Sequence, residues 1–462
     1  MIFLKSFLFI SANFFLLYLS GLIFVKFFKI KNFSFSIFFT ITIISILISF
    51  AYFKLNLQFN YIRIILITFL IISLLLSIKL ITKNSAKKIF FDYLIFLPPI
   101  ILFSFLIQFY GLQYYIFRGN YYDTINYTSM SLAFSNHTYS ELNEIFFNQV
   151  FNEDNIYLIK AGLLNEHRVI APLFFSIYYL PNLLDIFHAN FLVKLFFLAL
   201  SSLAIKIFFE ELKIINNKRT YLYSSVFPLC FWPIYIFEID AFAQLMALPF
   251  SIVSLCIIFL FSKNLNKFSK LQICFYSFII SGFFCIYPEQ GITFALFGVI
   301  IFLINNYKFL NFFYFAKKIF LIFGIFVFVI LLHENILTFL KFQLNEFTFI
   351  QFNWWGYYGS FILGSDNLVL NDNFVFELKN FIKNNNLNLI DIILKIHNDL
   401  KSNNYTFYFF NILPSLSGMY YLTVGKVITN LDFIKTSFVL VLNFLIIKIL
   451  LKNLITVFKI KK

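Results

Sequence analysis

The chain has 462 residues, of which 61% are hydrophobic, 23% aromatic and only 12% charged. Soluble globular domains carry about 45–50% apolar and about 25% charged residues, so the composition excludes a soluble globular protein. It also excludes disordered, collagen-like and disulfide-rich classes. The formal net charge of +15 is explained by lysines in cytoplasmic loops that face anionic lipid, rather than by nucleic-acid binding. Apolar blocks of about twenty residues match a hydrocarbon core about 30 Å thick, so we predict an all-α polytopic membrane protein.

The apolar runs form an N-terminal group and a central group, which a polar interval separates. The N-terminal region, 1–112, holds four runs, at 2–25, 33–53, 61–81 and 89–112. The central region, 189–336, holds six runs, at 189–210, 220–237, 241–262, 271–287, 290–305 and 319–336. The C-terminal segment, 434–462, holds a last run at 434–457. Within the late region 337–433, segments 347–364 and 405–424 are either two further spans or outer-surface segments. We therefore predict 11 or 13 transmembrane helices.

The lysine-rich connectors set the predicted orientation, because cytoplasmic loops carry an excess of Lys and Arg. The basic clusters are Lys26–Lys31, Lys79–Lys88, Lys213–Arg219, Lys263–Lys270, Lys308–Lys318 and the C-terminal Lys459–Lys462. A cytoplasmic position for all of them puts 113–188 and 337–433 outside, with 3 of the 21 acidic residues inside and 18 outside. With Lys88 and Lys213 on the same side, the chain between them must cross the membrane an even number of times. The runs 89–112 and 189–210 already supply two crossings, so the apolar stretch 168–187 should not cross the membrane. We predict there an amphipathic helix on the outer surface, interrupted at Pro181.

The first outer loop, 113–188, is the most polar part of the first half of the chain, and it contains Asp123. Asp123 follows the fourth apolar run by about ten residues, so we expect it near the membrane surface. A carboxylate there is partly desolvated, which raises its pKa toward a value useful for a general base. The alternative is a helix N-cap, because Asp is a favoured residue at that position and Thr124-Ile125-Asn126-Tyr127 follows it.

Two short motifs of this loop resemble those of the GT-C superfamily of membrane glycosyltransferases, which includes lipid A aminoarabinose transferases and protein O-mannosyltransferases. The first is the D-x-x-x-Y arrangement of Asp123 and Tyr127, followed by the small residue Ala133. The second is Glu166-His167-Arg168 followed by Pro172-Leu173-Phe174, before a surface helix. The sequence departs from the family at Thr124, where an acidic residue is common, and this weakens a paired acidic metal site.

The resemblance implies a GT-C-like fold and an enzyme in the inner membrane of a bacterium. The C-terminus is predicted to be cytoplasmic by the lysine clusters and by either count of spans. An enzyme of this family moves a sugar from a polyprenyl-phosphate donor to a lipid, glycan or protein acceptor on the outer face. Asp123 would deprotonate the acceptor hydroxyl, and direct displacement would invert the anomeric carbon. Tyr127, Glu166 and His167 are the matched residues that we assign to substrate binding.

Arginine usage adds candidates for binding the lipid phosphate. Only four arginines occur, Arg63, Arg118, Arg168 and Arg219, and two of them bracket the first outer loop. Because a guanidinium offers a rigid fork that matches phosphate oxygens, we expect Arg118 and Arg168 to hold the phosphate. Interfacial snorkelling is the alternative.

Glu289 lies in a tight turn after Pro288. We expect it either to face a central cavity, where it would help to hold the donor, a metal or the acceptor, or to be a solvated turn residue. We assign no residue as a metal ligand and leave a divalent metal ion open as a cofactor.

Other functional classes fit the sequence less well. A polysaccharide polymerase or ligase would be expected to place Arg and His in its late outer loop, where this chain has no Arg and only His397. A transporter commonly shows internal repeats, and none is visible here. A non-catalytic membrane protein is the remaining alternative.

Overall fold

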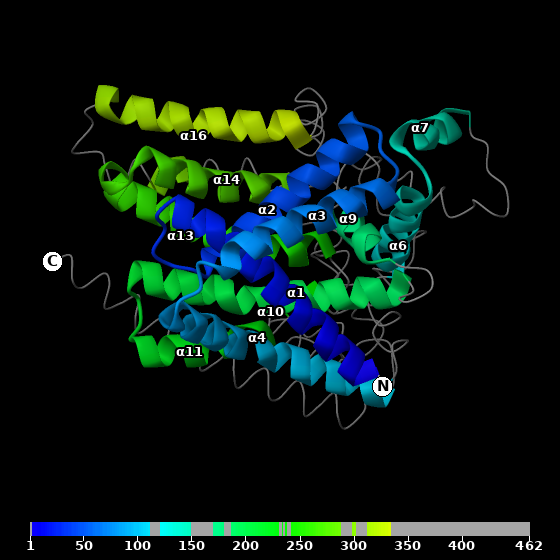
Figure 1. The fold of residues 1–462 in the computed structure, drawn as a ribbon, viewed down its shortest axis with the longest axis horizontal. Coiled ribbons are helices and arrows are strands. Elements are labelled where there is room, and N and C mark those ends of the chain that lie inside the picture. Colours follow the sequence, from blue (N-terminus) through cyan, green and yellow to red (C-terminus); the bar gives the residue numbers. More distant parts are fainter. Residues whose placement is uncertain are drawn as a thin grey trace, which may run out of the picture. The chain divides into compact units, whose positions relative to one another are not determined.

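The computed structural model describes residues 2–110, 121–148, 170–179, 186–230, 242–287, 298–301 and 312–333, together with Pro233, Ile236 and Phe237. The elements within these ranges are helices (Figure 1). They are α1 (Ile2–Phe27), α2 (Phe35–Ser49), η1 (Phe50–Lys54), α3 (Phe59–Ile78), α4 (Lys83–Tyr110), α6 (Tyr121–Asn136), α7 (Tyr139–Asn148), α9 (Ile170–Tyr178), α10 (Ile186–Leu212), α11 (Asn217–Val226), η3 (Phe227–Leu229), α13 (Phe242–Asn264), η4 (Leu265–Lys267), α14 (Lys270–Ile286) and α16 (Phe312–His333). The chain divides into two compact units. Nearly all of these helices belong to the first unit, Met1–Pro228 with Asp240–Phe342.

Six helices of the described part are long and apolar enough to cross a membrane. They are Phe3–Phe27, Phe35–Lys54, Phe59–Ile78, Lys83–Phe105, His188–Leu212 and Phe242–Lys263. Each falls on an apolar run of the sequence. Side chains of α3 such as Ile64, Ile67 and Leu75 are 56–61% exposed, a surface that a soluble protein would bury and a membrane protein turns to lipid. The prediction of an all-α polytopic membrane protein is confirmed.

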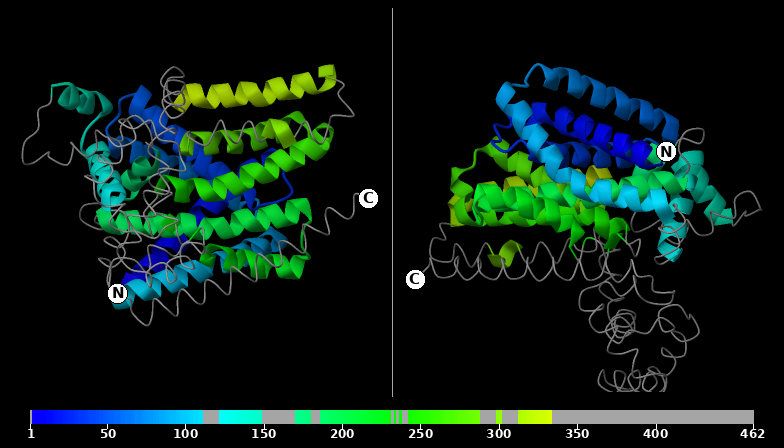
Figure 2. Two further views of the ribbon diagram at one scale, coloured as in Figure 1. Left: turned by 180° about the vertical axis from the view of Figure 1, so that it is seen from behind. Right: turned by 90° about the horizontal axis from the view of Figure 1, so that it is seen from below.

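The helices of the first unit form two neighbouring groups. In the N-terminal group, α1 contacts α2, α3 and α4. In the other group, α10, α13, α14 and α16 lie side by side. This is visible from the front in Figure 1 and from behind in the left panel of Figure 2. The groups are joined by contacts of α10 with α4 and of α2 with α14. Because α2 is the most enclosed of the N-terminal helices, it lies at the centre of this packing.

Two glycines let the neighbours of α2 approach it closely. A Cβ atom on Gly21 of α1 would lie 2.2 Å from the carbonyl oxygen of Ser36 and 2.6 Å from Oγ1 of Thr40. A Cβ atom on Gly282 of α14 would lie 2.3 Å from Oγ1 of Thr42. Small residues at helix contacts are typical of membrane proteins, where van der Waals packing drives helix association. Neither glycine can therefore carry a side chain without moving α2.

The lysine-rich connectors gather at one end of the first unit. Nζ of Lys26, at the end of α1, donates to the carbonyl oxygen of Leu80, between α3 and α4. Nε2 of Gln272, at the start of α14, donates to the carbonyl oxygen of Lys29 at 3.1 Å. These contacts join connectors that the charge pattern assigns to one side, as the predicted parity requires. The cytoplasmic identity of that side stays a prediction.

Connectors without such lysine clusters meet at the opposite end, together with α6, α7 and α9. The hydroxyl of Tyr52, in η1, donates to the carbonyl oxygen of His137 at 3.0 Å. The side chain of Asn56 donates to Oγ of Ser140 at 2.6 Å and accepts from its backbone N–H at 2.9 Å. The α2–α3 connector thereby holds the turn between α6 and α7. Because these helices follow the fourth span, this end carries the predicted first outer loop.

The stretch 168–187 contains a helix, α9, that ends at Tyr178, before Pro181. With nine residues, α9 is about 13.5 Å long and cannot cross a membrane. The described helix of this stretch is therefore too short to be a span, and its predicted place on the outer surface of the membrane stays a prediction. Residues 170–176 are all buried, because α6, α10, α13 and α2 surround the helix.

The apolar run 220–237 also differs from the prediction of one continuous helix. Helix α11 ends at Val226, and a 3₁₀ turn, Phe227–Leu229, follows it. Pro228 explains why the α-helix does not continue, since proline has no N–H to donate to the carbonyl four residues earlier.

Candidate functional site

The predicted general base, Asp123, is the third residue of α6, so it lies inside the first turn rather than at the N-cap. Its side chain lies outside the described residues. Tyr127 follows one turn later on the same helix and is 1% exposed, with its ring 6.0 Å from that of Phe242 in α13. This contact holds the first half of α6 against the bundle. Asp123 thus precedes the buried Tyr127 by about one turn of the same helix.

A reciprocal pair of serines locks α6 to α9. Oγ of Ser131 donates within α6 to the carbonyl of Tyr127 at 2.6 Å and lies 3.0 Å from the carbonyl of Pro172 in α9. Oγ of Ser176 in α9 lies 2.9 Å from the carbonyl of Ser131 and from that of Pro172. Both serines are fully buried. The position of α6 is therefore tied to that of α9.

Most of the other predicted site residues lie outside the described residues. These are Arg118, Glu166, His167, Arg168 and Glu289. Their roles, and their convergence on Asp123, stay predictions. Within the described ranges, no group of three or more His, Cys, Asp or Glu side chains is arranged to hold a metal ion.

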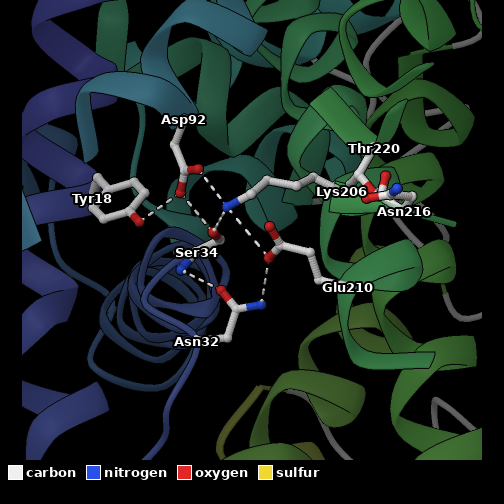
Figure 3. A network of polar contacts seen from close by, with 8 residues as sticks. All are labelled: Tyr18, Asn32, Ser34, Asp92, Lys206, Glu210, Asn216 and Thr220. Atoms are coloured by element: carbon white, nitrogen blue, oxygen red, sulfur yellow. Dashed lines mark hydrogen bonds and ion pairs between the residues drawn. The ribbon is translucent and has the colours of Figure 1, made fainter. Parts of the chain in front are cut away.

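A second polar site, which the sequence reasoning missed, lies at the lysine-rich end of the bundle (Figure 3). Its centre is an ion pair between Lys206 of α10 and Asp92 of α4, with Nζ 2.5 Å from Oδ1. Tyr18 of α1 and Ser34 each donate a hydroxyl to Oδ2 of Asp92, at 2.7 and 2.6 Å. Nζ of Lys206 also lies 2.9 Å from Oγ of Ser34 and 3.5 Å from Oε2 of Glu210.

The network links four segments of the chain. Asn32, in the connector between α1 and α2, donates to Glu210 at 3.2 Å and accepts from the N–H of Ser34 at 3.1 Å. Lys206 and Asp92 are 5% and 1% exposed, whereas Glu210 is 27% exposed and reaches the surface. An ammonium and a carboxylate so deeply buried are stable only as a pair with further hydrogen bonds, and both conditions are met here.

The sequence carried a signal for this network. Asp92 and Lys206 interrupt apolar runs, and ionisable residues within membrane spans are costly and usually have a partner or a function. Asp92 and Glu210 are also two of the three acidic residues that the charge pattern puts on the lysine-rich side. What the sequence did not supply was the pairing, because Asp92 and Lys206 are 114 residues apart in the chain.

A small pocket lies near the opposite end, between α1, α9 and α10. It is lined by Phe9, Asn13, Leu17, Phe174, Tyr178, Val193, Phe196 and Phe197. The Tyr178 hydroxyl donates to Oδ1 of Asn13 across it at 2.9 Å. The enclosed space is sufficient for about one water molecule, so this pocket alone does not accommodate a prenyl chain.

No protein-family model, curated protein or solved structure matches the chain.

Proposed function

We propose that the chain is a glycosyltransferase of a bacterial inner membrane. It would move a sugar from a polyprenyl-phosphate donor to a lipid, glycan or protein acceptor on the outer face, with Asp123 as the general base. The observation that carries the proposal is the position of Asp123. It lies in the first turn of α6, a helix of 16 residues at the end of the bundle opposite the lysine-rich connectors.

In the proposed step, the Asp123 carboxylate takes the proton of an acceptor hydroxyl as its oxygen attacks the anomeric carbon of the sugar. The bond between that carbon and the phosphate oxygen breaks, and polyprenyl phosphate leaves with the bonding electrons. One displacement inverts the anomeric configuration. General-base assistance of this kind contributes about 10²–10⁴-fold to a rate.

The phosphate requires cations, because its negative charge grows as the sugar leaves. We assign this task to Arg118 and Arg168, which bracket the loop that carries Asp123. Glu166, His167 and Glu289 are assigned to orienting the sugar and the acceptor. The burial of Tyr127 against Phe242 supports α6 from the bundle side, and its contact with substrate stays a prediction.

The test is a transfer assay with the purified full-length chain in liposomes. Radiolabelled polyprenyl-phosphate sugars, each made from a different nucleotide sugar, serve as donors, and lipids extracted from the native membrane serve as acceptors. Wild type should transfer at least one sugar, and Asp123→Asn should abolish transfer. Glu144→Gln is the matched control, because Glu144 is an exposed acid of α7 in the same loop. Equal activity of Asp123→Asn and wild type would refute the assignment of the base.

A transporter is the second candidate, and the buried Lys206–Asp92 pair favours it, since ionisable residues inside spans often mark ion pathways. The two functions separate in one comparison. A transporter should lose uptake on Asp92→Asn and keep it on Asp123→Asn, whereas a glycosyltransferase should lose sugar transfer on Asp123→Asn.

A further inference from the structure

Arg63 of α3 binds the C-terminal end of α9. Its NH2 group donates to the carbonyl oxygens of Ser176 and Tyr179, at 2.6 and 2.8 Å. Its NH1 group donates to Oδ1 of Asn60 at 2.7 Å, and its guanidinium carbon lies 5.4 Å from the centre of the Phe59 ring. These neighbours fix the guanidinium from three sides.

This contact satisfies a physical need of α9. The last four carbonyl groups of a helix have no partner within the helix, and the helix dipole favours a cation at that end. A nine-residue helix is too short to be stable by itself, so its position depends on such contacts. Arginine meets two carbonyls with one planar group, which the single ammonium of lysine does less well.

The contact reaches α6 through α9. Ser176 supplies a carbonyl to Arg63 and, through its hydroxyl, binds the carbonyl of Ser131 in α6. Ser131 in turn binds the carbonyls of Pro172 and Tyr127. Because these residues are buried in a close-packed interior, a shift of α9 must move α6 as well.

We propose that Arg63 is a positioning residue for the reaction at Asp123: by capping α9, it fixes α6 and so the place of the general base. This inference rests on the proposed glycosyltransferase function. A general base must lie within hydrogen-bond reach of the acceptor hydroxyl. A misplacement of about 1 Å costs about 100-fold in rate, so loss of the cap should lower kcat while binding of the donor is retained.

The experiment combines kinetics with a report on local structure that requires no substrate. The variants are Arg63→Gln and Arg63→Lys, and the matched control is Arg219→Gln, because Arg219 is an exposed arginine at the opposite end. Each is made in a background in which the four native cysteines are replaced by alanine. Two fully buried alanines receive reporter cysteines, one at a time: Ala133→Cys in α6 and Ala204→Cys in the lysine-rich half of α10. The labelling rate by a water-soluble maleimide is measured for each.

Arg63→Gln should raise labelling at position 133 about tenfold or more and leave position 204 within about twofold. With wild type active, it should also lower kcat about 10–100-fold at a KM changed by less than about threefold. Arg63→Lys should recover part of both effects, and Arg219→Gln should show neither.

Unchanged labelling at position 133, an equal rise at both reporters, or an unchanged kcat in Arg63→Gln would each overturn the proposal. Failure of the glycosyltransferase function is seen separately, as an absence of transfer by wild type and all variants alike. The change in labelling at position 133 relative to position 204 then still decides whether Arg63 fixes α6.

Discussion

Replacing Lys206 by Met removes the cation of the buried network and leaves the Asp92 carboxylate, 1% exposed, with two neutral donors among the described residues, Tyr18 and Ser34. Breaking a buried ion pair at one partner costs about 3–5 kcal/mol, because the remaining charge is neither hydrated nor compensated. Asp92→Leu leaves Lys206 with Ser34 and the more distant Glu210, so we expect a loss of similar size.

The double variant Asp92→Leu, Lys206→Met should be more stable than either single variant. It contains no buried unpaired charge at these positions, and replacement of a buried pair by apolar residues of similar volume is often close to neutral. The hydroxyls of Tyr18 and Ser34 lose their acceptor, which adds about 1 kcal/mol each. We therefore expect a net loss of about 2 kcal/mol for the double variant.

Equilibrium unfolding in mixed micelles of a mild and a denaturing detergent, followed by tryptophan fluorescence, measures these free energies. Lys79→Met, at an exposed lysine of the same end, is the control and should change the free energy of unfolding by less than about 0.5 kcal/mol. Losses that add in the double variant, or a neutral Lys206→Met, would show that the network is not an electrostatic unit.

Three further predictions follow from the described contacts. Gly21→Ala and Gly282→Ala should each lower the free energy of unfolding by about 1–3 kcal/mol, because their Cβ atoms overlap α2, whereas Gly324→Ala, with open space around it, should be neutral or slightly stabilising in the same assay. Asn56→Ala removes both hydrogen bonds to Ser140, so limited proteolysis should cut near α7 several-fold faster; an unchanged cleavage rate would mean that α7 is held by other contacts. A cysteine at Asn143, exposed on α7, should react with an impermeant maleimide in intact cells, and one at Lys267 only after permeabilisation; the reverse pattern would invert the predicted orientation.

The six candidate membrane spans of the described residues could be predicted from the sequence because length and apolarity decide whether a helix can cross a bilayer. The lysine clusters also predicted which connectors share an end, as the contact between Gln272 and Lys29 bears out. Parity of the spans excluded a crossing at 168–187, but it could not show where α9 lies. The burial of α9 depends on contacts with α6 and α13, which are distant in sequence, and an apolar segment fits a buried position as well as a membrane surface.

The same distinction between local and long-range contacts applies to the candidate site. Asp123 and Tyr127 lie one turn apart on α6, which is a local relation that their spacing in the sequence fixes once the segment is helical. The Lys206–Asp92 pair is not local, and each residue alone is only a charge within an apolar run. The function of Arg63 as a helix cap was also beyond the sequence, since its acceptors are backbone carbonyls, which carry no sequence signal.

The measurement that tests the proposed function most directly is the rate at which wild type, Asp123→Asn and Glu144→Gln move sugar from a polyprenyl-phosphate donor in liposomes. We predict transfer by wild type and Glu144→Gln, with inverted anomeric configuration in the product. For Asp123→Asn we predict a rate at least about 100-fold lower. Transfer by Asp123→Asn at the wild-type rate would contradict the assignment of Asp123, and its absence from all three proteins with every donor would contradict the glycosyltransferase proposal itself.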